Sequence, residues 1–493
     1  MQRLLRSPDT WIAALAVVLA LLFLGSRGIW DPDEGRYTNV ALHMLDSGDW
    51  IDPQRSETVN HWTKPPLTYW AIASSVAVFG HNAGAARLPS ALSYLLCVWL
   101  AWKIARRLAP GSERQAAVLY ATMLLPFGAA QFISTDYLLA ACETLAMWGF
   151  VEARFGDGRK RWLAVMWTGF ALAFLTKGPP GLLPLLAVVA FDLLTPGRVR
   201  PRLLQWWSVP LFVLVALPWY GAVMLRHPGL FDYFIGNDVV DRFATDDFAR
   251  HGEWYGWIAI YLPTLLLGTL PWTPALLRWA RTLPASLRGW RQPSSRAGDG
   301  AALLLALWLL LPLVVFCISR SRLPLYILPL FVPLAVLAAR QRFSEGKTLP
   351  RWRWLLLWAA CLLALKFAAA QWPTHKDARA WTQAIDGRTH GAISQVDFVD
   401  DMARYGLHLH LGAAVNKLSL QAKPQPRFNP EYDGDVADHL GAHFDPDALW
   451  ITRHDHFGQV DARLRALGYA AVAHGTPYED RVLFRVVRVD AQP

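Results

Sequence analysis

AALLLALWLLLPLVVFCI, which runs from Ala301 to Ile318, is an unbroken stretch of 18 residues without a charged side chain. A run of about 18 or more apolar residues is long enough to cross the hydrocarbon core of a bilayer as a helix. A second apolar run, WIAALAVVLALLFLG, extends from Trp11 to Gly25. Of the 493 residues, 54% are hydrophobic and 17% are charged, against about 25% charged in a typical soluble domain. The composition excludes a disordered chain, a coiled coil and a collagen, and it predicts an integral membrane protein with many spans.

Apolar runs recur along most of the chain and predict an all-α polytopic membrane fold. By length and hydropathy we predict about eleven spans, near residues 9–26, 85–105, 114–132, 135–153, 162–176, 179–195, 206–225, 255–275, 300–318, 323–340 and 353–371. The tail that follows is more polar. We therefore predict a transmembrane domain over residues 1–372 and a separate domain over residues 373–493.

Basic residues gather in alternate gaps between the predicted spans. Because cytoplasmic loops carry an excess of Lys and Arg, the N-terminus is predicted to be cytoplasmic, and residues 291–300 are predicted to form a flexible cytoplasmic loop. The two long acidic loops, residues 27–84 and 226–254, are then outside, and an odd number of spans places the tail outside as well. The net charge of +10 comes from these short clusters, so it predicts topology and no nucleic-acid partner.

The tail contains short alternating runs, ALWIT from Ala448 to Thr452 and RVLFRVVRV from Arg481 to Val489. Alternation with period two is typical of half-buried strands, and a helix-like stretch lies between the two runs at residues 460–467. These patterns predict a small α/β domain. The four cysteines all lie inside apolar runs and form no CxxC motif, so they are interpreted as core residues.

The first outward loop opens with DPDEGRY, from Asp31 to Tyr37. One interpretation is a solvated helix start, because acidic residues in the first turn favour the helix dipole. The other is a catalytic carboxylate at the membrane surface, Asp33 with Glu34 beside it, and Arg36 one helical turn away to tune it or to bind phosphate.

Further charged and aromatic residues fall on the same predicted face. Two prolines follow Lys64 and hold its backbone extended. Asp136 starts a predicted span, where it could also be an ordinary helix cap. Lys177 and Arg322 are cations on the side that topology disfavours, so each needs a partner or a ligand, and Tyr326 lies near the second of them. Together these residues have the balance of charge needed to hold an anionic lipid carrier.

Several of these segments resemble a known family. DPDEGRYTNVALHMLDSGDW, KPPLTYW and ARLPS, at residues 31–50, 64–70 and 86–90, look like the first outward loop of bacterial membrane glycosyltransferases of the protein O-mannosyltransferase superfamily. Within that superfamily the likeness is to the 4-amino-4-deoxy-L-arabinose lipid A transferase branch, and it covers roughly residues 9–345. The resemblance implies a GT-C fold in the bacterial inner membrane, an active site that faces the periplasm and a polyprenyl-phosphate sugar as donor.

The resemblance also implies roles for individual residues. The presumed catalytic carboxylate maps to Asp33, with Glu34 beside it, and the lysine that contacts carrier phosphate maps to Lys64. Other cavity positions of the family map to Asp136, Lys177, Arg242 and Tyr326. The combined prediction is a catalytic set of Asp33, Glu34 and Asp136 and a substrate-binding set of Arg36, Lys64, Lys177, Arg242, Arg322 and Tyr326.

One family feature is missing from this sequence. The lipid A transferases place Glu before the KPP lysine and His in the second long loop, and these form a metal site. Here the first position is Thr63, and the matching loop, NDVVDRF at residues 237–243, has no His. No metal ligand is therefore predicted, and a divalent metal stays an alternative. The other candidates for such a role are His251 and the pairs His408/His410 and His454/His456.

The predicted function is transfer of a sugar from a polyprenyl-phosphate donor to a periplasmic acceptor, which could be lipid A, another cell-envelope glycolipid or protein. A single displacement predicts inversion at the anomeric carbon. The alternative is a transporter or flippase for a lipid-linked sugar, which would place ionisable residues at mid-membrane. A third reading, a non-catalytic scaffold, leaves the charged outward loops unexplained.

Overall fold

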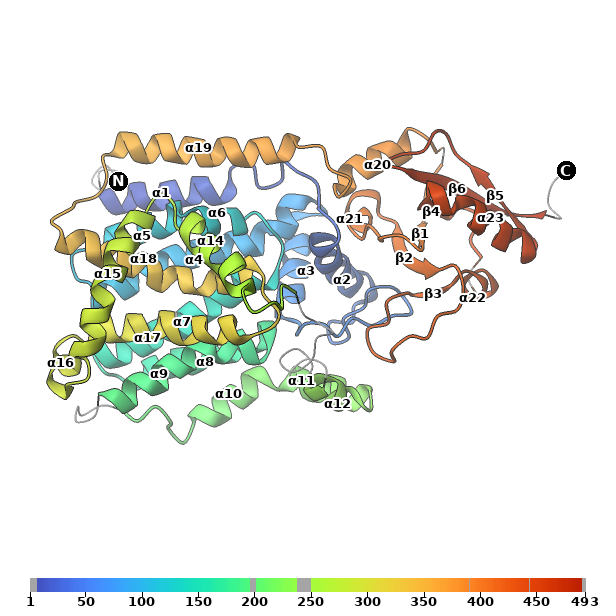
Figure 1. Ribbon diagram of the computed structural model, residues 1–493. Helices are drawn as coiled ribbons and strands as arrows, with labels where there is room; N and C mark the ends of the chain where they lie inside the picture. Colours follow the sequence, from blue (N-terminus) through green and yellow to red (C-terminus); the bar gives the residue numbers. More distant parts are fainter. Residues whose placement is uncertain (1–6, 196–200, 237–249, 390, 443, 490–493) are drawn as a thin grey trace. The chain divides into compact units, whose positions relative to one another are not determined.

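The computed structural model describes residues 7–195, 201–236, 250–389, 391–442 and 444–489. The chain divides into two compact units (Figure 1). The helical unit comprises residues 1–23, 64–68 and 88–366. The mixed unit comprises residues 24–63, 69–87 and 367–493, so it combines most of the first outward loop with the tail.

The named elements of the helical unit are helices and short 3-10 turns, among its described residues. Their bounds are α1 Pro8–Leu21, α4 Ala83–Leu108, α5 Glu113–Thr122, α6 Leu124–Ala129, α7 Thr135–Phe155, α8 Arg161–Lys177, η1 Pro179–Leu182, α9 Leu183–Leu194, α10 Ser208–Ala216, α11 Pro218–Arg226, α12 Leu230–Ile235, α14 Gly256–Gly268, α15 Thr273–Gly289, α16 Pro293–Gly298, α17 Gly300–Ile318, η3 Pro324–Leu330, α18 Phe331–Ser344 and α19 Trp352–Gln371. The first turn of α4 and the last turn of α19 belong to the mixed unit.

Membrane-spanning helices are present, as the sequence predicted. Within the described residues, four helical segments are long and apolar enough to cross a bilayer, and the number rises to six if each of two bent helix pairs is one span. The four are Ala83–Leu108, Gly300–Ile318, Pro324–Ser344 and Trp352–Gln371. The predicted number of eleven is not confirmed.

The predicted span at 114–132 is divided between α5 and α6. Pro126 has no N–H, so it cannot donate to the carbonyl of Thr122 four residues earlier. The indole Nε1 of Trp358 donates to that carbonyl instead, at 2.8 Å. A proline therefore ends the regular helix, and a tryptophan from α19 satisfies the exposed backbone group.

The predicted span at 255–275 is wrong in its second half. α14 ends at Gly268, and the chain turns by 119° into α15, which the sequence analysis missed. Pro271 lies at this turn and cannot continue the helix, and Pro274 lies in the first turn of α15, where proline is tolerated. The segment predicted as a flexible loop at residues 291–300 also contains a short helix, α16.

Helices α7 and α8 run antiparallel and pack closely because glycine lies at their contact. A Cβ on Gly149 would lie 2.6 Å from the backbone nitrogen of Met166, and one on Gly169 would lie 2.5 Å from that of Ala146. Small residues let two membrane helices approach closely in this way. The contact aligns the first turn of α7 with the last turn of α8.

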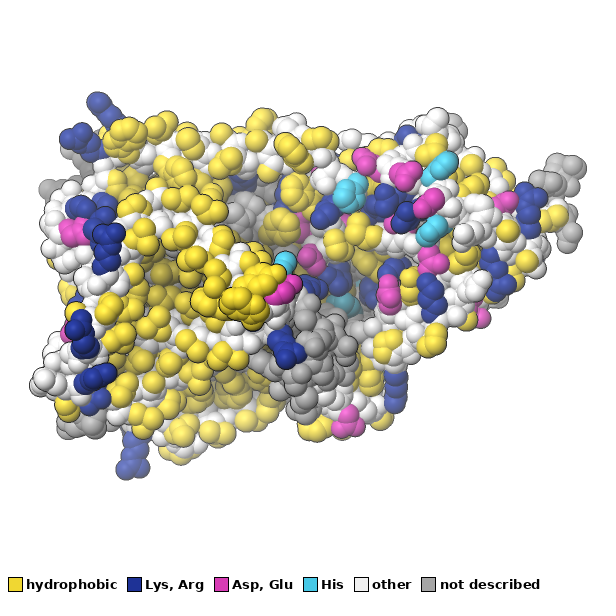
Figure 2. All heavy atoms as spheres, viewed as in Figure 1, with side chains coloured by type: hydrophobic (Ala, Val, Ile, Leu, Met, Phe, Trp, Pro, Cys, Tyr) yellow, Lys and Arg dark blue, Asp and Glu magenta, His cyan; other side chains and the backbone are white. Residues whose placement is uncertain are grey.

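Charge is distributed unevenly between the two ends of the helical unit. Figure 2 shows Lys and Arg side chains gathered at the end where α15 and α16 lie, with hydrophobic side chains over the adjoining surface. Arg106 and Arg107 end α4, and Arg154 lies in the last turn of α7. Asp136, in the first turn of α7, and Lys177, in the last turn of α8, lie at the end of the helical unit away from these arginines.

The mixed unit is built on a six-stranded sheet, which confirms the predicted small α/β domain of the tail. The strands are β1 Gln395–Val399, β2 Ala414–Ser419, β3 Gly434–Asp435, β4 Leu449–Arg453, β5 Tyr469–Ala473 and β6 Arg481–Arg488, in the order β3-β2-β1-β4-β6-β5. The first four strands are parallel, and β6 is antiparallel to both β4 and β5.

Helices cover both faces of this sheet. They are α20 Ala378–Asp386, α21 Leu407–Leu411, α22 Val436–Ala442 and α23 Phe457–Ala466. Successive residues of a strand point to opposite faces. Accordingly, Phe398 joins an apolar cluster with Trp381 of α20, whereas Val399 joins a second cluster with Leu464 of α23. The sheet is therefore the middle layer of three.

The first outward loop contains two helices. They are α2, Asp33–Ser47, and α3, Leu67–Phe79. Val40 and Met44 of α2 pack with Tyr69 of α3 in a small apolar cluster. At 13 residues, α3 is too short to span a bilayer.

Candidate active site

Three predicted site residues meet at one end of the helical unit. The ammonium of Lys177, in the last residue of α8, forms an ion pair with the carboxylate of Asp136 in the first turn of α7. The same ammonium lies over the ring of Tyr326, 4.3 Å from its centroid. Ser134, and not Asp136, caps α7, because its hydroxyl accepts from the backbone N–H of Asp136. The carboxylate of Asp136 is therefore not used as the helix cap, and its role in the structure is the pairing with Lys177.

Glu143 is a charged residue of this region that the sequence analysis missed. It lies seven residues after Asp136 on α7, it is 3% exposed, and it interacts electrostatically with both Lys177 and Asp136. A spacing of seven residues puts two side chains on the same helix face. An acidic residue inside an otherwise apolar predicted span was the available signal.

Arg322 holds two backbone segments together. Its Nη1 donates to the carbonyls of His251 and Glu253 at 2.6 and 2.8 Å, and its Nη2 donates to that of Cys317 at 3.1 Å. The residue is only 4% exposed. These contacts favour a role in fixing the end of the second outward loop over the predicted contact with substrate.

Glu34 is fully buried in the mixed unit and carries two ion pairs. Arg27 Nη1 and Arg87 Nη2 lie 2.5 and 2.9 Å from its Oε2, and the backbone N–H of Trp30 also donates to it. Burial alone would raise the pKa of Glu34, but Arg87 and Arg27 outweigh it and lower the pKa to about 2. Neither arginine was predicted as a site residue. The geometry favours a positioning role for Glu34 over the predicted catalytic one.

Asp33, unlike Glu34, is exposed to solvent. Its side chain is 62% exposed in the first turn of α2, and its Oδ1 accepts from Arg36 Nη2 at 2.6 Å. The neighbouring acids of DPDEGRY therefore have different environments, because Glu34 is wholly buried whereas Asp33 is open to solvent. A solvent-facing carboxylate paired with one arginine is available to a substrate.

Two further predicted residues complete the set. Lys64 is half-buried and is followed by the buried Pro65 and Pro66. Arg242 lies outside the described residues.

The residues present do not fit the metal site that the family resemblance implies. The hydroxyl of Thr63, at the position of the family glutamate, is hydrogen-bonded to His61 Nε2 at 2.6 Å. Across the part of the chain that the structure describes, no group of three or more His, Cys, Asp or Glu side chains is arranged to hold a metal. His408 instead contacts Asn39 and Asp46, and His410 Nε2 accepts from the backbone N–H of Ile29.

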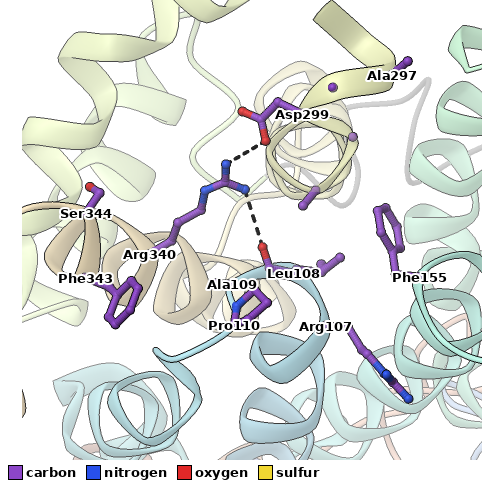
Figure 3. Close-up of a pocket in the computed structure, with 13 residues that line it drawn as sticks. Arg107, Leu108, Ala109, Pro110, Phe155, Ala297, Asp299, Arg340, Phe343 and Ser344 are labelled. Carbon is purple, nitrogen blue, oxygen red and sulfur yellow. Dashed lines mark hydrogen bonds and ion pairs between the residues drawn. The ribbon is translucent and has the colours of Figure 1, made fainter.

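A cavity of about 460 Å³ opens at the other end of the helical unit (Figure 3). Arg340 projects toward it and is paired with Asp299 at 2.6 Å, and Phe155 at the end of α7 faces it. Arg107, which also lines it, is paired with Glu152. Since α7 has 21 residues, at a rise of roughly 1.5 Å per residue, this cavity is well separated from Asp136 and Lys177.

Residues 63–221 match the family model described as dolichyl-phosphate-mannose-protein mannosyltransferase. The chain is 35% identical over 342 residues to undecaprenyl phosphate-alpha-4-amino-4-deoxy-L-arabinose arabinosyl transferase 2 of Pseudomonas fluorescens strain Pf0-1, covering 67% of this chain and 59% of that protein. It is 36% identical over 361 residues to the corresponding transferase of Pseudomonas aeruginosa strain PAO1, covering 70% of this chain and 62% of the relative. The chain thus spans about three fifths of the length of the curated relatives that it matches.

Solved structures extend the comparison to the whole fold. The crystal structure of ArnT from Cupriavidus metallidurans bound to undecaprenyl phosphate superposes with a TM-score of 0.74 at 22% identity, covering 98% of this chain and 99% of that one. Its apo form gives a TM-score of 0.73 at 20% identity. The predicted GT-C fold is confirmed, and the predicted resemblance to the protein O-mannosyltransferase superfamily is supported by the family match and by these relatives.

Proposed function

We propose that this chain is a membrane glycosyltransferase that moves a sugar from a polyprenyl-phosphate donor to a cell-envelope acceptor. The observation that carries the proposal is the ammonium of Lys177, held between the carboxylate of Asp136 and the ring of Tyr326 at the end of two tightly packed helices. The relatives named above are arabinosyl transferases that use undecaprenyl phosphate-linked aminoarabinose. By that likeness the donor is a polyprenyl-phosphate pentose and the acceptor is lipid A.

In the proposed chemistry, the lysines bind the leaving phosphate and a carboxylate acts on the acceptor. The leaving group is a lipid phosphate, and Lys177 and Lys64 stabilise its charge as the glycosidic bond breaks. An acceptor hydroxyl needs a base, and Asp33 is the exposed carboxylate that can take its proton while the oxygen attacks the anomeric carbon. One displacement inverts that carbon. An acceptor phosphate, with a second pKa of about 6, is already ionised and needs no base. In that case Asp33 would orient the sugar or the cations that bind the donor phosphate.

The proposed topology places the site in the periplasm of a bacterial inner-membrane protein with about eleven spans. Residues 1–372 form the transmembrane domain, and residues 373–493 form a periplasmic α/β domain. The gathering of Lys and Arg at one end of the helical unit supports this orientation, because that end would be cytoplasmic.

Reporter fusions test the orientation. A fusion within residues 291–300 should show a cytoplasmic reporter, and a fusion after Pro493 should show a periplasmic one. The physical reason is the basic end of the helical unit, which resists translocation. The reverse pattern at both positions would place the proposed site on the wrong side of the membrane.

The activity itself is tested with the full-length protein in liposomes. Polyprenyl-phosphate aminoarabinose and lipid A are supplied, and mass spectrometry should show lipid A heavier by one sugar. Polyprenyl-phosphate hexose with the same acceptor tests the choice of sugar. Movement of the donor lipid across the bilayer without any product would instead support the flippase, for which the described ionisable residue deep in a helix is Glu143.

Replacement of Lys177 separates substrate binding from ion pairing. Lys177→Met should lower kcat/KM for the donor by about ten- to hundredfold, because a hydrogen bond to a charged group contributes roughly 1.5–3 kcal/mol. The double variant Lys177→Met/Asp136→Asn removes the unpaired acid and should stay impaired.

Lys103→Met is the matched control for this lysine. Lys103 also lies over aromatic rings, 5.1 Å from that of Trp99 and 5.3 Å from that of Trp102, but it lies near the far end of α4. It should keep normal turnover. Recovery of activity in the double variant would show that Lys177 serves only to neutralise Asp136.

A further inference from the structure

The start of the first outward loop is joined to the tail by backbone hydrogen bonds inside the mixed unit. The N–H of Asp31 donates to the carbonyl of Lys376 at 2.9 Å, and that of Ala378 donates to the carbonyl of Ile29 at 2.9 Å. The carboxylate of Asp31 is 2% exposed and accepts from the backbone N–H of Gly406. The segment just before Asp33 is thus fixed to residues more than 340 positions away.

Two glycines allow the start of the first outward loop and the tail to approach closely. A Cβ on Gly35 would collide with the carboxylate of Asp31 and lie 2.7 Å from the backbone nitrogen of Gly406. A Cβ on Gly406 would lie 2.7 Å from that of Ala378 and 3.0 Å from Asp31 Oδ2. Contacts under about 3.0 Å force a shift of backbone or side chain. Gly35 and Gly406 therefore have no room for a side chain where the first outward loop meets the tail, a contact called here the seam.

The short helix α21 begins at Leu407, directly after Gly406, and packs against α2. His408 of α21 is hydrogen-bonded to Asn39 through Nδ1 at 2.8 Å and to Asp46 through Nε2 at 3.1 Å. Asn39 lies in the middle of α2, and Asp46 lies in its last turn. Together with Asp31 and Gly35, these contacts hold α2 at its start, middle and end.

The loop after α2 has a second anchor in the tail. Arg55 donates to Asp433 Oδ1 through Nε and Nη2 at 3.3 and 2.8 Å, and both side chains are under 10% exposed. Arg55 Nη1 also donates to the carbonyl of Pro430 at 2.9 Å. A buried and fully bonded arginine fixes geometry strongly, because its guanidinium fork is planar.

We propose that the segment Gly406–Leu411 of the tail, here called the α21 clamp, is a positioning element that sets where α2 presents Asp33 and Arg36 to the substrate. This inference rests on the proposed transferase function. It gives the α/β domain a part in the reaction without contact with substrate. Catalytic geometry is demanding, since a misplacement of about 1 Å can cost about 10²-fold in rate.

Two variants of the full-length protein test the clamp. Gly406→Ala pushes the seam apart, and His408→Ala removes the bonds to Asn39 and Asp46 without adding bulk. In both variants we expect kcat to fall by about ten- to hundredfold while KM for the donor changes little. Amide hydrogen exchange over residues 33–47 should become about tenfold faster.

Gly458→Ala is the matched control, because Gly458 lies in α23 of the same domain and a Cβ there meets nothing within 4 Å. It should leave kcat and exchange unchanged. Normal exchange over α2 in both test variants would overturn the clamp. Faster exchange with unchanged kcat per folded molecule would show that the contact serves stability alone. If wild-type protein has no transferase activity, the proposed function fails, and hydrogen exchange still reports on the clamp.

Discussion

Asp33→Asn is expected to lower transfer by about 10²–10⁴-fold, the usual contribution of a general base. The side chain is 62% exposed, and its ion pair with Arg36 is open to solvent, so the pair contributes at most about 1 kcal/mol to stability. Asn keeps the size and hydrogen-bonding capacity of Asp but loses its basicity. Turnover should therefore collapse while the thermal unfolding midpoint stays near that of the wild type.

The measurement is turnover in reconstituted membranes, with a thermal-shift assay on the same preparation. Binding of the donor should change little, because removing a negative charge does not repel a phosphate. If Asp33 serves only the dipole of α2, activity will also stay near wild type. That result would move the catalytic role to Asp136.

Glu34→Gln is expected to destabilise the protein by about 3–5 kcal/mol, because it removes the charge shared by two buried guanidinium groups. Arg27 and Arg87 are 8% and 1% exposed in their side chains, so water cannot replace the lost carboxylate. Glu57→Gln in the same loop is the control, since Glu57 is exposed and its replacement should cost little. Thermal unfolding in detergent compares the two variants.

The same carboxylate predicts an acid dependence. The pKa of Glu34 falls from an ordinary 4.5 in the unfolded chain to about 2 in the folded one. The folded state therefore binds fewer protons, and the stability from Glu34 is fully present above pH 4.5 and is lost as the pH falls toward 2. The slope of stability against pH in that window should be smaller in Glu34→Gln. An unchanged slope, or a wild-type midpoint, would contradict the buried ion pairs.

Much of the fold follows from local pattern. The apolar runs at residues 300–318 and 353–371 correspond to α17 and α19, and the alternating run at 481–489 corresponds to β6. Such signals reside in consecutive residues, so one sequence suffices to find them. The turn between α14 and α15 was missed although Pro271 and Pro274 mark it, because the apolar run continues through it.

The site was harder to predict because its environments come from distant segments. Asp33 and Glu34 are neighbours in sequence and look equivalent, yet only Glu34 is enclosed, by an arginine 53 positions away. Arg322 looked like an unpartnered cation, and backbone carbonyls bind it. Lys177, Asp136 and Tyr326 were each predicted singly. The pairing of Lys177 with Asp136 depends on the glycine contact between α7 and α8, and Tyr326 comes from the separate 3-10 turn η3.

The bond between Asp31 and Gly406 joins residues 375 positions apart, and this separation has a consequence for biosynthesis. A ribosome adds about 5–20 residues per second, so the partner of Asp31 is made about 20–75 s later. During that interval the first outward loop has left the ribosome, but the tail residues that bind it have not yet been made. A chain whose synthesis stops before Gly406 would insert its earlier helices and still lack the contacts that fix α2. Completion of the α/β domain would then be the step that gives α2 its final position.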